Sequence, residues 1–496
     1  MSDTQNDNLL ARLAGKGNGD DASAWAALAA CEPKRASSSQ AAAKPDDKLN
    51  AMLDRIRQVA GDAPAVPPTS AVAETSADTF LPLEPKSFEE AQLSVSSVEG
   101  LILKLLLSRG DTTGRQISDH VKLSFRLIDE LLRTMKADQL VVHKASAPMN
   151  DYLYQMTDLG RERARRLAEH CTYFGAAPVA LNEYISSVAL QSLTKQNPTV
   201  KDLKRAFEDL LISPHMLRRL GPAINSGRGL FLFGAPGNGK TSIAERVTKA
   251  FGQAIWIPRA IGVDGEIIRL YDPNAHEPMP LSSSGGLLED NHIDKRWVRI
   301  RRPTIVVGGE LTMDNLELTL NTSTGISEAP MQLKSNCGTL VIDDFGRQRM
   351  STDELLNRWI VPLEKRMDYL NLANGKKIEV PFDQLVIFST NLEPKALVDD
   401  AFLRRIPYKI EVLDPTEEEF RNLFKLMAPK LGFEYQDEPV TYLIKTHYQA
   451  VGRRMRCCQP RDLLMQVRNM CLYEGTKTEM TNAAMDFAVE NYFAVV

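Results

Sequence analysis

The spacing of apolar and polar positions divides the chain into segments that differ in their capacity to fold. Residues 1–85 are rich in Ala, Ser, Asp and Pro and contain tracts such as SSSQAAAKP and APAVPPTSAVAETSAD. Such tracts bury too little apolar surface to offset the loss of chain entropy, so we predict a disordered arm. Within it, residues 22–31 and 46–60 have helical spacing and would either dock onto a partner or bind nothing.

Regular helical and strand spacing begins near residue 93 and continues to residue 171. It predicts helices over residues 97–108, 113–120 and 124–137, strands over 139–143 and 152–156, and a closing helix over 157–169. Three helices followed by a two-stranded wing indicate an α+β winged helix-turn-helix domain over residues 93–171.

The sequence leaves the partner of this domain open. The helix that would enter a DNA groove carries a small basic surplus, formed by Arg126, Arg133 and Lys136 against Asp129 and Glu130. The closing helix is more basic and contains Arg161, Arg163, Arg165 and Arg166. Because a fold does not fix a function, both DNA contact and protein docking remain as hypotheses.

Residues 172–226 are predicted to be a helical linker, with helices over residues 181–191 and 199–211. The linker leads into a strand over residues 229–233 (GLFLF), followed by GAPGNGKT at residues 234–241. This stretch fits the pattern G-x-x-x-x-G-K-[ST] without a mismatch. An amphipathic helix begins near Lys240. The strand in front and the helix behind are the context in which this pattern binds a polyphosphate.

The residue types of this loop suit ATP with Mg²⁺ as cofactors. Glycines let successive backbone N–H groups surround phosphates at a helix N-terminus, whose dipole favours negative charge. Lys240 would reach the β and γ phosphates, and the Thr241 hydroxyl would bind Mg²⁺. The expected phosphate-binding residues are Gly234, Ala235, Pro236, Gly237, Asn238, Gly239, Lys240, Thr241 and Ser242.

Two later apolar runs end in polar side chains. Residues 339–342 (TLVI) lead into Asp343 and Asp344, and residues 385–390 (LVIFST) lead into Asn391. Unbroken apolar runs predict parallel strands buried on both faces, whose carboxyl ends lie at one edge of the sheet. Asp343 is predicted to hold Mg²⁺, Asp344 to orient or deprotonate the attacking water, and Asn391 to contact that water or the γ phosphate.

Residues 254–330 are long for a single strand-helix-strand unit and contain the runs AIWIP, EIIRLY and TIVVGGEL. We expect residues 259–330 to be an insertion. Inserted loops often carry specificity, and this one would then be a hairpin that projects into a central pore. The alternative is a surface flap that only packs on the core.

Composition and charge narrow the class of protein. With 496 residues, 43% of them hydrophobic, the chain can form several cores, and a net charge of -4 favours no polymer partner in general. The six cysteines include no C-x-x-C pair, which favours reduced thiols in a cytosol over a zinc ribbon or a disulfide scaffold. The polar N-terminus and the lack of an apolar run of roughly 18 residues predict a cytoplasmic protein without membrane contact.

Five segments in order, GAPGNGKT, LVIDD, FSTN, FLRRI and QPRDLL, resemble the AAA+ ATPases over roughly residues 200–496. The resemblance implies an α/β fold with a parallel P-loop sheet in a nucleotide-binding domain over residues 227–413 and a helical lid over residues 414–496. It implies an arginine that acts on the γ phosphate of a neighbouring subunit, which maps to Arg405, with Arg404 as the second choice. A lid arginine that contacts the phosphate in cis maps to Arg461. Lead-in residues that hold the adenine ring would include Ile212 and Leu220.

One position departs from the family pattern. Most members have Asp-Glu where this chain has Asp343 and Asp344, although helicase-loader and insertion-element ATPases are similar to it there. Hydrolysis is therefore expected, at a slower rate, because the shorter side chain must lie closer to the water. A winged helix followed by IDDFGRQ is also similar to bacterial proteins described as predicted ATPases with chaperone activity.

The expected function is a Mg²⁺-dependent ATP-hydrolysing ring, a hexamer, that remodels a protein or protein-DNA client. The arginine at position 405 motivates the homo-oligomer, because such a residue serves a neighbouring copy. The alternative is an ATP-switched DNA-binding regulator or a mobile-element or replication accessory ATPase. A third hypothesis is a signalling ATPase that assembles once and hydrolyses rarely.

Overall fold

The computed structural model describes residues 80–280 and 293–494. Most of the predicted arm over residues 1–85, with both of its helical stretches, lies outside the described residues. The described end of that segment packs on the folded chain. The Phe80 ring lies 5.0 Å from the Trp297 ring, and Leu83 forms a β-bridge with Ile293. Residues 80–83 therefore contact the folded chain, through the Phe80 ring and the backbone of Leu83.

Residues 95–170 form an α+β unit with its own core. Its elements are α2 (Val95–Arg109), β1 (Thr112–Thr113), α3 (Gly114–Val121), α4 (Phe125–Ala137), β2 (Val141–Ala147), β3 (Asp151–Met156) and α5 (Asp158–His170). The strands form an antiparallel sheet in the order β1-β3-β2. The Asp151 carboxylate accepts hydrogen bonds from the backbone N–H groups of Gly114 and Arg115, which ties β3 to the start of α3.

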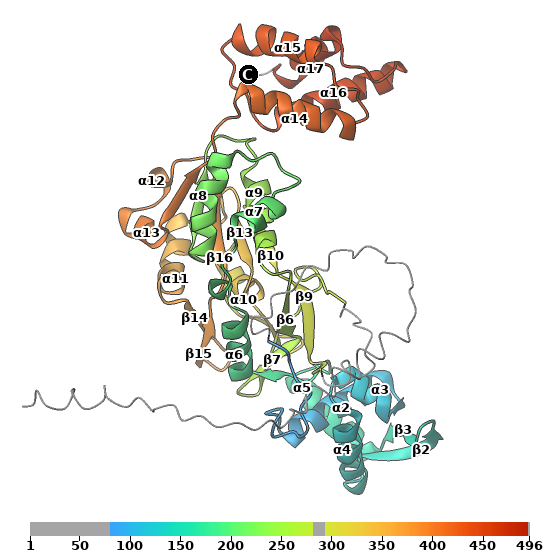
Figure 1. Ribbon diagram of the computed structural model, residues 1–496. Coiled ribbons are helices and arrows are strands. Elements are labelled where there is room, and N and C mark those ends of the chain that lie inside the picture. The colour runs from blue at the N-terminus through green and yellow to red at the C-terminus, as the bar shows by residue number, and fades with distance from the viewer. Residues whose placement is uncertain (1–79, 281–292, 495–496) are drawn as a thin grey trace, which may run out of the picture. The chain divides into compact units, whose positions relative to one another are not determined.

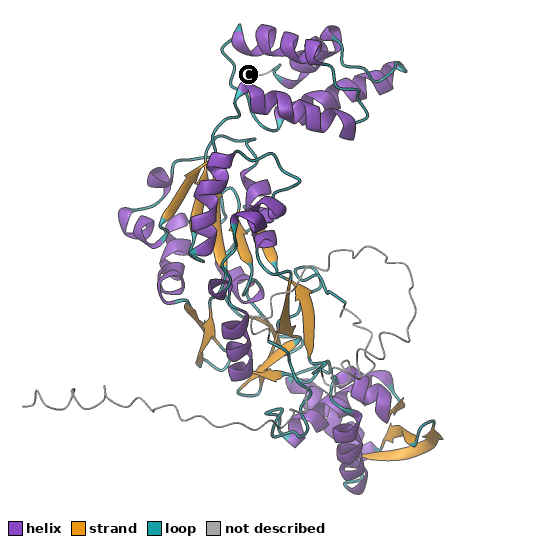
Figure 2. Ribbon diagram, in the orientation of Figure 1, coloured by secondary structure: helices purple, strands orange, loops and turns teal. Residues whose placement is uncertain are grey.

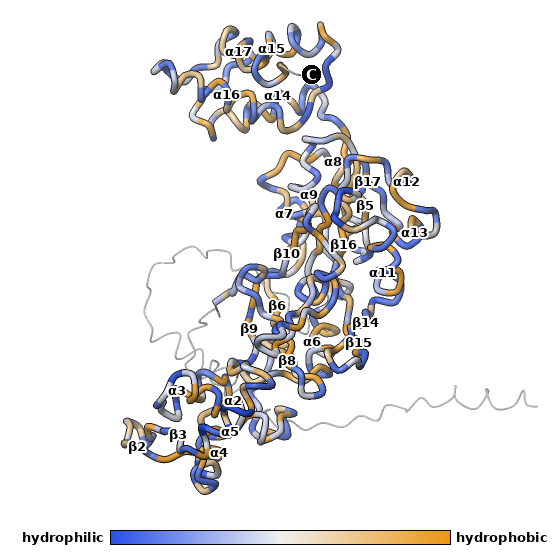
Figure 3. Tube along the Cα trace, turned by 180° about the vertical axis from the view of Figure 1, so that it is seen from behind, coloured by the Kyte–Doolittle hydropathy of each residue, from blue (hydrophilic) through white to orange (hydrophobic). Residues whose placement is uncertain are grey.

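Five parallel strands form the central sheet (Figure 1). Their order is β10 (Thr304–Val307), β13 (Thr339–Ile342), β16 (Leu385–Thr390), β5 (Leu230–Phe233) and β17 (Tyr408–Glu411). Every residue of β13 and β16 is buried. The strands of this sheet are hydrophobic (Figure 3). Together with the helices that pack on it, the sheet makes this part of the protein a mixed α/β structure.

Helices cover both faces of the central sheet, since alternate strand residues belong to two different cores. Leu230 and Leu232 pack with one group of helices, whereas Phe231 packs with the other. The first group is α7 (Val200–Ala206), α8 (Pro214–Asn225) and α9 (Lys240–Val247). The second is α10 (Met331–Lys334), α11 (Thr352–Lys365), α12 (Pro394–Leu397) and α13 (Asp400–Arg405).

The segment predicted to be a helical linker, residues 172–226, is divided between two cores. Its first part contains the short strand β4 (Val179–Ala180) and helix α6 (Leu181–Gln191), which pack away from the central sheet. Its second part contains α7 and α8, which pack on that sheet. The parallel pairing of β4 with β7 was not predicted, because a strand of two residues is too short to indicate its partner.

The residues packed around α6 form a second α+β module. Its strands are β6 (Ala254–Pro258), β7 (Ala260–Val263), β8 (Glu266–Arg269), β9 (Trp297–Arg301), β11 (Thr319–Asn321), β12 (Ile326–Glu328), β14 (Met367–Asn371) and β15 (Lys377–Pro381). They form a mixed sheet, β11-β12-β8-β7-β4, and two antiparallel pairs, β6-β9 and β14-β15. The predicted insertion over residues 259–330 thus includes β10, which lies in the central sheet and not in this module.

Residues 414–494 contain only helices among their regular elements (Figure 2), and we call this part the lid. Its helices are α14 (Glu417–Lys430), α15 (Asp437–Leu443), α16 (Gln459–Glu474) and α17 (Asn482–Tyr492), with a π-helical turn at Ile444–Gln449. Thr416 and Glu419 form a capping box at the start of α14. Across residues 80–280 and 293–494, no helix has the length and apolar character needed to cross a membrane.

Candidate active site

The loop between β5 and α9, residues 234–239, requires glycine at two positions, and we call it the glycine loop. Gly234 and Gly237 have φ angles of 136° and 83°. A Cβ atom would lie 2.5 Å from the Val412 carbonyl oxygen at Gly234, and 2.6 Å from the Cys458 sulfur at Gly237. Neither position can carry a side chain without displacing its neighbour. Gly239, with φ 81°, then caps the N-terminus of α9.

Lys240, the first residue of α9, turns back over the glycine loop. Its Nζ donates to the carbonyl oxygens of Gly234 and Ala235, both at 3.0 Å, and to Asn391 Oδ1 at 2.7 Å. The side chain is buried, and this burial lowers the pKa of the Lys240 ammonium, against the opposing effect of nearby Asp343 and Asp344. The ammonium is therefore held by acceptors on the loop and on Asn391, the residue directly after β16.

Thr241 and Asp343 provide a pair of oxygen atoms beside this lysine. Thr241 Oγ1 donates to Asp343 Oδ2 at 2.8 Å, and the Asp343 backbone N–H donates to the Val307 carbonyl oxygen at 2.8 Å. The first bond joins the start of α9 to the end of β13. A hydroxyl and a carboxylate are hard oxygen ligands of the kind that Mg²⁺ accepts while keeping several waters. Among the described residues there is no group of three or more His, Cys, Asp or Glu that could hold a metal ion.

Asp344 and Asn391 complete the group. Asn391 Nδ2 donates to Asp344 Oδ1 at 3.1 Å, so the amide of Asn391 contacts both Lys240 and Asp344. Asp344 has a φ of 47°, in the left-handed region that only a few residue types other than glycine enter readily. The structure thus holds its exposed carboxylate in an uncommon backbone conformation.

Gln348 stabilises that conformation, and its role was not predicted. Its Nε2 donates to the carbonyl oxygens of Asp343 and Asp344 at 3.0 and 3.2 Å, while its Oε1 accepts from the Gly346 N–H at 2.8 Å. One side chain therefore closes the turn after β13. A glutamine in the run IDDFGRQ has no spacing signal that would have singled it out.

The strand order explains why these residues meet. β16 lies between β5, which leads into the glycine loop, and β13, which leads into the two aspartates. Because all three strands are parallel, their carboxyl ends share one edge of the sheet. Asn391 follows β16 directly and therefore lies between Lys240 on one side and Asp344 on the other.

The three predicted arginines lie on helices outside this group. Arg404 and Arg405 end α13, and Arg405 Nε lies 3.3 Å from Glu364 Oε2 on α11. Arg461, in the first turn of α16, forms an ion pair with its neighbour Asp462, and 59% of its side chain is exposed. The described contacts of Arg461 are therefore within its own helix rather than with the glycine loop.

Of the remaining predicted residues, Pro236 and Asn238 lie in the glycine loop, and Ser242 lies in α9, where its carbonyl accepts from Arg246. The two proposed adenine contacts differ in exposure. Leu220 is fully buried on α8, whereas Ile212 is only partly buried beside the same core. Only Ile212 retains surface that a base could contact.

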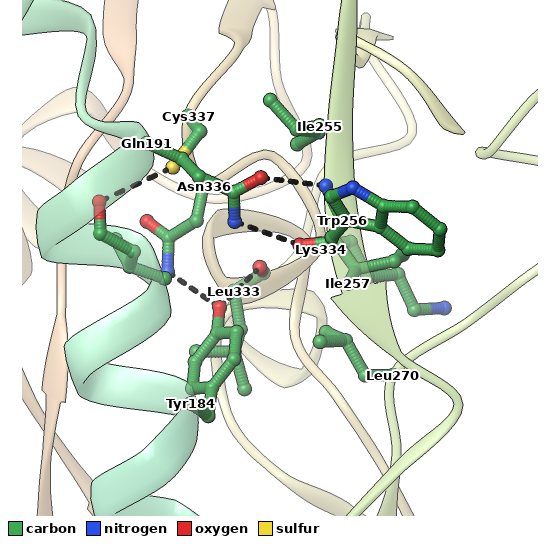
Figure 4. A pocket seen from close by; sticks show the side chains of 11 residues that line it. Tyr184, Gln191, Ile255, Trp256, Ile257, Leu270, Leu333, Lys334, Asn336 and Cys337 are labelled. Carbon is green, nitrogen blue, oxygen red and sulfur yellow. Dashed lines mark hydrogen bonds between the residues drawn. The ribbon is translucent and has the colours of Figure 1, made fainter. Parts of the chain in front are cut away.

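A cavity in the second α+β module does not form part of this site (Figure 4). Its volume is about 10 Å³, about the size needed for one water molecule. Polar groups along it bond to each other: Tyr184 accepts from Asn336 Nδ2 at 2.9 Å, and Gln191 bonds to the backbone of Trp256. These satisfied groups indicate a packed core and not a substrate site.

Comparisons with known proteins assign no function to this chain. A family model described as Domain of unknown function (DUF8689) matches residues 416–491 of the lid. No curated protein matches the chain. One point mutant of RuvB from Thermotoga maritima matches with 12% sequence identity over 58% of this chain and 73% of that chain, with a TM-score of 0.34. A second point mutant matches with 14% identity over 57% of this chain and 71% of that chain, with the same TM-score.

The RuvB Holliday junction branch migration motor of Thermotoga maritima also matches, with 14% identity over 57% of this chain and 70% of that chain and a TM-score of 0.33. TM-scores this low do not establish a shared fold. The chemistry of the site therefore rests on this chain's own residues.

Proposed function

We propose that the chain is a Mg²⁺-dependent AAA+ ATPase that assembles into a ring and remodels a protein or protein-DNA client. The observation that carries this proposal is the linked group at the sheet edge, in which Lys240 bonds Asn391, Asn391 bonds Asp344, and Thr241 bonds Asp343. A buried cation, a hydroxyl-carboxylate pair, an exposed carboxylate and an amide are the groups that phosphoryl transfer to water requires.

The glycine loop fits the triphosphate of ATP. Side chains are excluded at Gly234 and Gly237, so a ligand could approach the loop backbone closely. The loop ends at the N-terminus of α9, where unpaired N–H groups and the helix dipole favour an anion. Lys240 would neutralise the terminal phosphates, and Thr241 with Asp343 would hold Mg²⁺. ATP supplies the phosphoryl group that passes to water.

The other residues of the site would act on the attacking water. Asp344 would accept its proton, and Asn391 would orient the water or bond the terminal phosphate. Gln348 would keep Asp344 aimed at the site by closing the turn that carries it. The shorter reach of aspartate, compared with glutamate, favours slow turnover.

The proposal of a ring is based on two arginines at the end of α13. Arg405 lies on a helix end with a partly exposed side chain, and Arg404 next to it is exposed. A guanidinium there would serve the terminal phosphate bound to a neighbouring copy, as arginine fingers do in related phosphoryl-transfer systems. The lid, with Arg461 on α16, would move with the nucleotide state.

A second candidate function comes from residues 95–170, whose helices and three-stranded sheet we propose to be a winged helix. In that reading, ATP controls assembly and this unit binds DNA through α4. Arg133 on α4 pairs with Asp129, however, and Lys144 on β2 pairs with Asp111, which reduces the free positive charge. A salt-dependent, sequence-selective gel shift would support DNA binding, and client-stimulated turnover that ignores DNA would support protein remodelling.

The variant Lys240→Ala tests the nucleotide site. It should abolish ATP binding measured by calorimetry, because it removes the cation that the loop and Asn391 hold. Lys249→Ala is a matched control, since Lys249 is exposed after α9 and should leave the affinity unchanged. Near-normal ATP affinity in Lys240→Ala would show that the phosphates bind elsewhere.

A further inference from the structure

The lid contacts the glycine loop through a short run of residues before α16. The backbone N–H of Cys458 donates to the Gly237 carbonyl oxygen at 2.9 Å, and that of Cys457 donates to Asn238 Oδ1 at 3.3 Å. The close approach of the Cys458 sulfur is also what excludes a side chain at Gly237. The conformation of the loop therefore depends on where this part of the lid lies.

Asp414 contacts both the glycine loop and the run of residues before α16. Its Oδ1 accepts a hydrogen bond from Asn238 Nδ2 at 2.7 Å and also forms an ion pair with Arg456. Asp414 lies just beyond β17, the strand that pairs with β5. One carboxylate thus connects the end of the central sheet, the glycine loop and the lid.

We propose that Asp414 is a positioning residue that couples the nucleotide site to the lid, by holding Asn238 in the glycine loop and Arg456 in the lid at one point. Through it, Arg456 is the lid guanidinium that faces the phosphate site. This proposal rests on the proposed ATPase function. It assigns the coupling between the nucleotide site and the lid to Asp414 and Arg456, whereas the family resemblance points to Arg461.

The surroundings of the three residues support this assignment. Asn238 is 4% exposed, so its amide has little access to water and depends on Asp414 and Cys457 for partners. Arg456 lies close enough to Lys240 for its positive charge to lower the pKa of that lysine. Arg461, by contrast, is directed to Asp462.

The contact can be tested without nucleotide by alkylation of the cysteines. In Asp414→Ala, loss of the Asn238 and Arg456 partners should free the lid from the loop, and iodoacetamide should modify Cys458 at least about threefold faster, as measured by mass spectrometry. Cys471, which is buried inside the lid, reports unfolding and should keep its rate. The control Asp437→Ala removes another lid carboxylate, one that pairs with Arg421 and Tyr435, and should leave both rates unchanged.

The effect on the nucleotide site is measured by calorimetry with Mg²⁺-ATP. Hydrogen bonds to charged groups are strong enough that Asp414→Ala should weaken binding about tenfold. Asn238→Ala should weaken ATP binding by a similar factor. The variant that carries both changes should have an ATP affinity within about twofold of the lower of the two single-variant affinities, because both changes break the same interaction. Arg456→Ala should weaken binding more than Arg461→Ala, and Arg456→Lys should restore part of the loss.

The outcomes separate this proposal from the ATPase proposal. Unchanged Cys458 alkylation in Asp414→Ala, or additive losses in the double variant, would overturn the role of Asp414. Faster Cys458 alkylation in a protein that binds no ATP would retain the contact and reject the nucleotide site. If Asp414→Ala also accelerates Cys471 alkylation, Asp414→Asn replaces it, because the amide keeps the size of the side chain and an acceptor for Asn238 while losing the ion pair with Arg456.

Discussion

The Nζ atom of Lys240 lies 2.7 Å from Oδ1 of Asn391, although 151 positions separate the two residues in the chain. The contact follows from the sheet, because β16 pairs directly with β5 and Thr390 is in register with Phe233. Asn391 uses its other amide atom to contact Asp344. A single amide therefore connects the group proposed to bind phosphate with the group proposed to activate water.

Replacing Asn391 should separate binding from turnover. Asn391→Ala removes a donor aimed at the reacting groups, so we expect kcat to fall about a hundredfold while the ATP dissociation constant changes by less than about fivefold. Steady-state hydrolysis and calorimetry measure the two quantities. The control Asn371→Ala, at an exposed position on β14, should change neither. A large loss of affinity with normal kcat would mean that Asn391 serves binding only.

Two changes at Asp344 should have opposite effects. Asp344→Asn cannot accept a proton, so it should bind ATP with near wild-type affinity and hydrolyse it at least about a hundredfold more slowly. Asp344→Glu should keep turnover or raise it, because its carboxylate reaches further. Its melting temperature should fall, since glutamate tolerates a φ of 47° less well than aspartate. Unchanged hydrolysis by Asp344→Asn would move the proton acceptor to another residue.

The sequence predicted the central features of this site because each has a short-range signal. The apolar runs at residues 230–233, 339–342 and 385–390 are parallel strands of the central sheet. The first leads into the glycine loop, the second into Asp343 and Asp344, and the third into Asn391. Runs without polar interruption mark strands covered on both faces. Once three such strands are parallel neighbours, the residues after them meet at one edge.

Other features depend on contacts between distant segments, which no local pattern carries. The run TIVV at residues 304–307 looks like any buried strand, and only its pairing with β13 puts it in the central sheet. The link between Asp414, Asn238 and Arg456 joins residues up to 218 positions apart, counting from Asn238 at position 238 to Arg456 at position 456. The role of Gln348 could not be predicted either, because its side-chain hydrogen bonds depend on the geometry of the turn after β13 and not on a sequence pattern.

Arg405→Ala tests whether sites are shared between copies of the chain. The variant should keep its affinity for ATP and lose about a thousandfold or more in turnover, because a missing arginine finger affects the transition state. Wild-type turnover per chain should rise with protein concentration. The control Glu364→Ala removes the partner of Arg405 on α11 without removing the guanidinium, so turnover should persist.

A mixing experiment makes the same test sharper. Combining Arg405→Ala with Lys240→Ala should restore part of the activity, since the second variant can lend its arginine to a site whose lysine is intact. Recovery should depend on the ratio of the two variants. If mixtures show no more activity than the separate variants, and wild-type turnover per chain is independent of concentration, the site is complete within one chain.

The second α+β module should lose stability in acid through His276. This side chain is 1% exposed, with Nδ1 accepting from the Asp272 N–H at 3.1 Å and Nε2 placed 2.9 Å from the Lys334 carbonyl oxygen. The bond to Nδ1 requires the neutral ring, because only an unprotonated nitrogen can accept, and the proton then lies on Nε2. Burial lowers the pKa of His276, against the opposing effects of the Lys334 carbonyl and the Asp272 carboxylate.

The direction of the pH effect follows from this lowered pKa. Below about pH 6.5 the unfolded chain binds a proton at His276 that the folded chain does not, so the free energy of unfolding falls as pH falls from about 6.5 towards the folded pKa, by up to about 1.4 kcal/mol per pH unit. Urea unfolding at several pH values measures this slope. His276→Gln should be less stable at pH 7 and should show a smaller slope, whereas His215→Gln, at an exposed position on α8, should keep the wild-type slope. An unchanged slope in His276→Gln would assign the acid sensitivity to other groups, first among them His120, whose pKa is also lowered by burial.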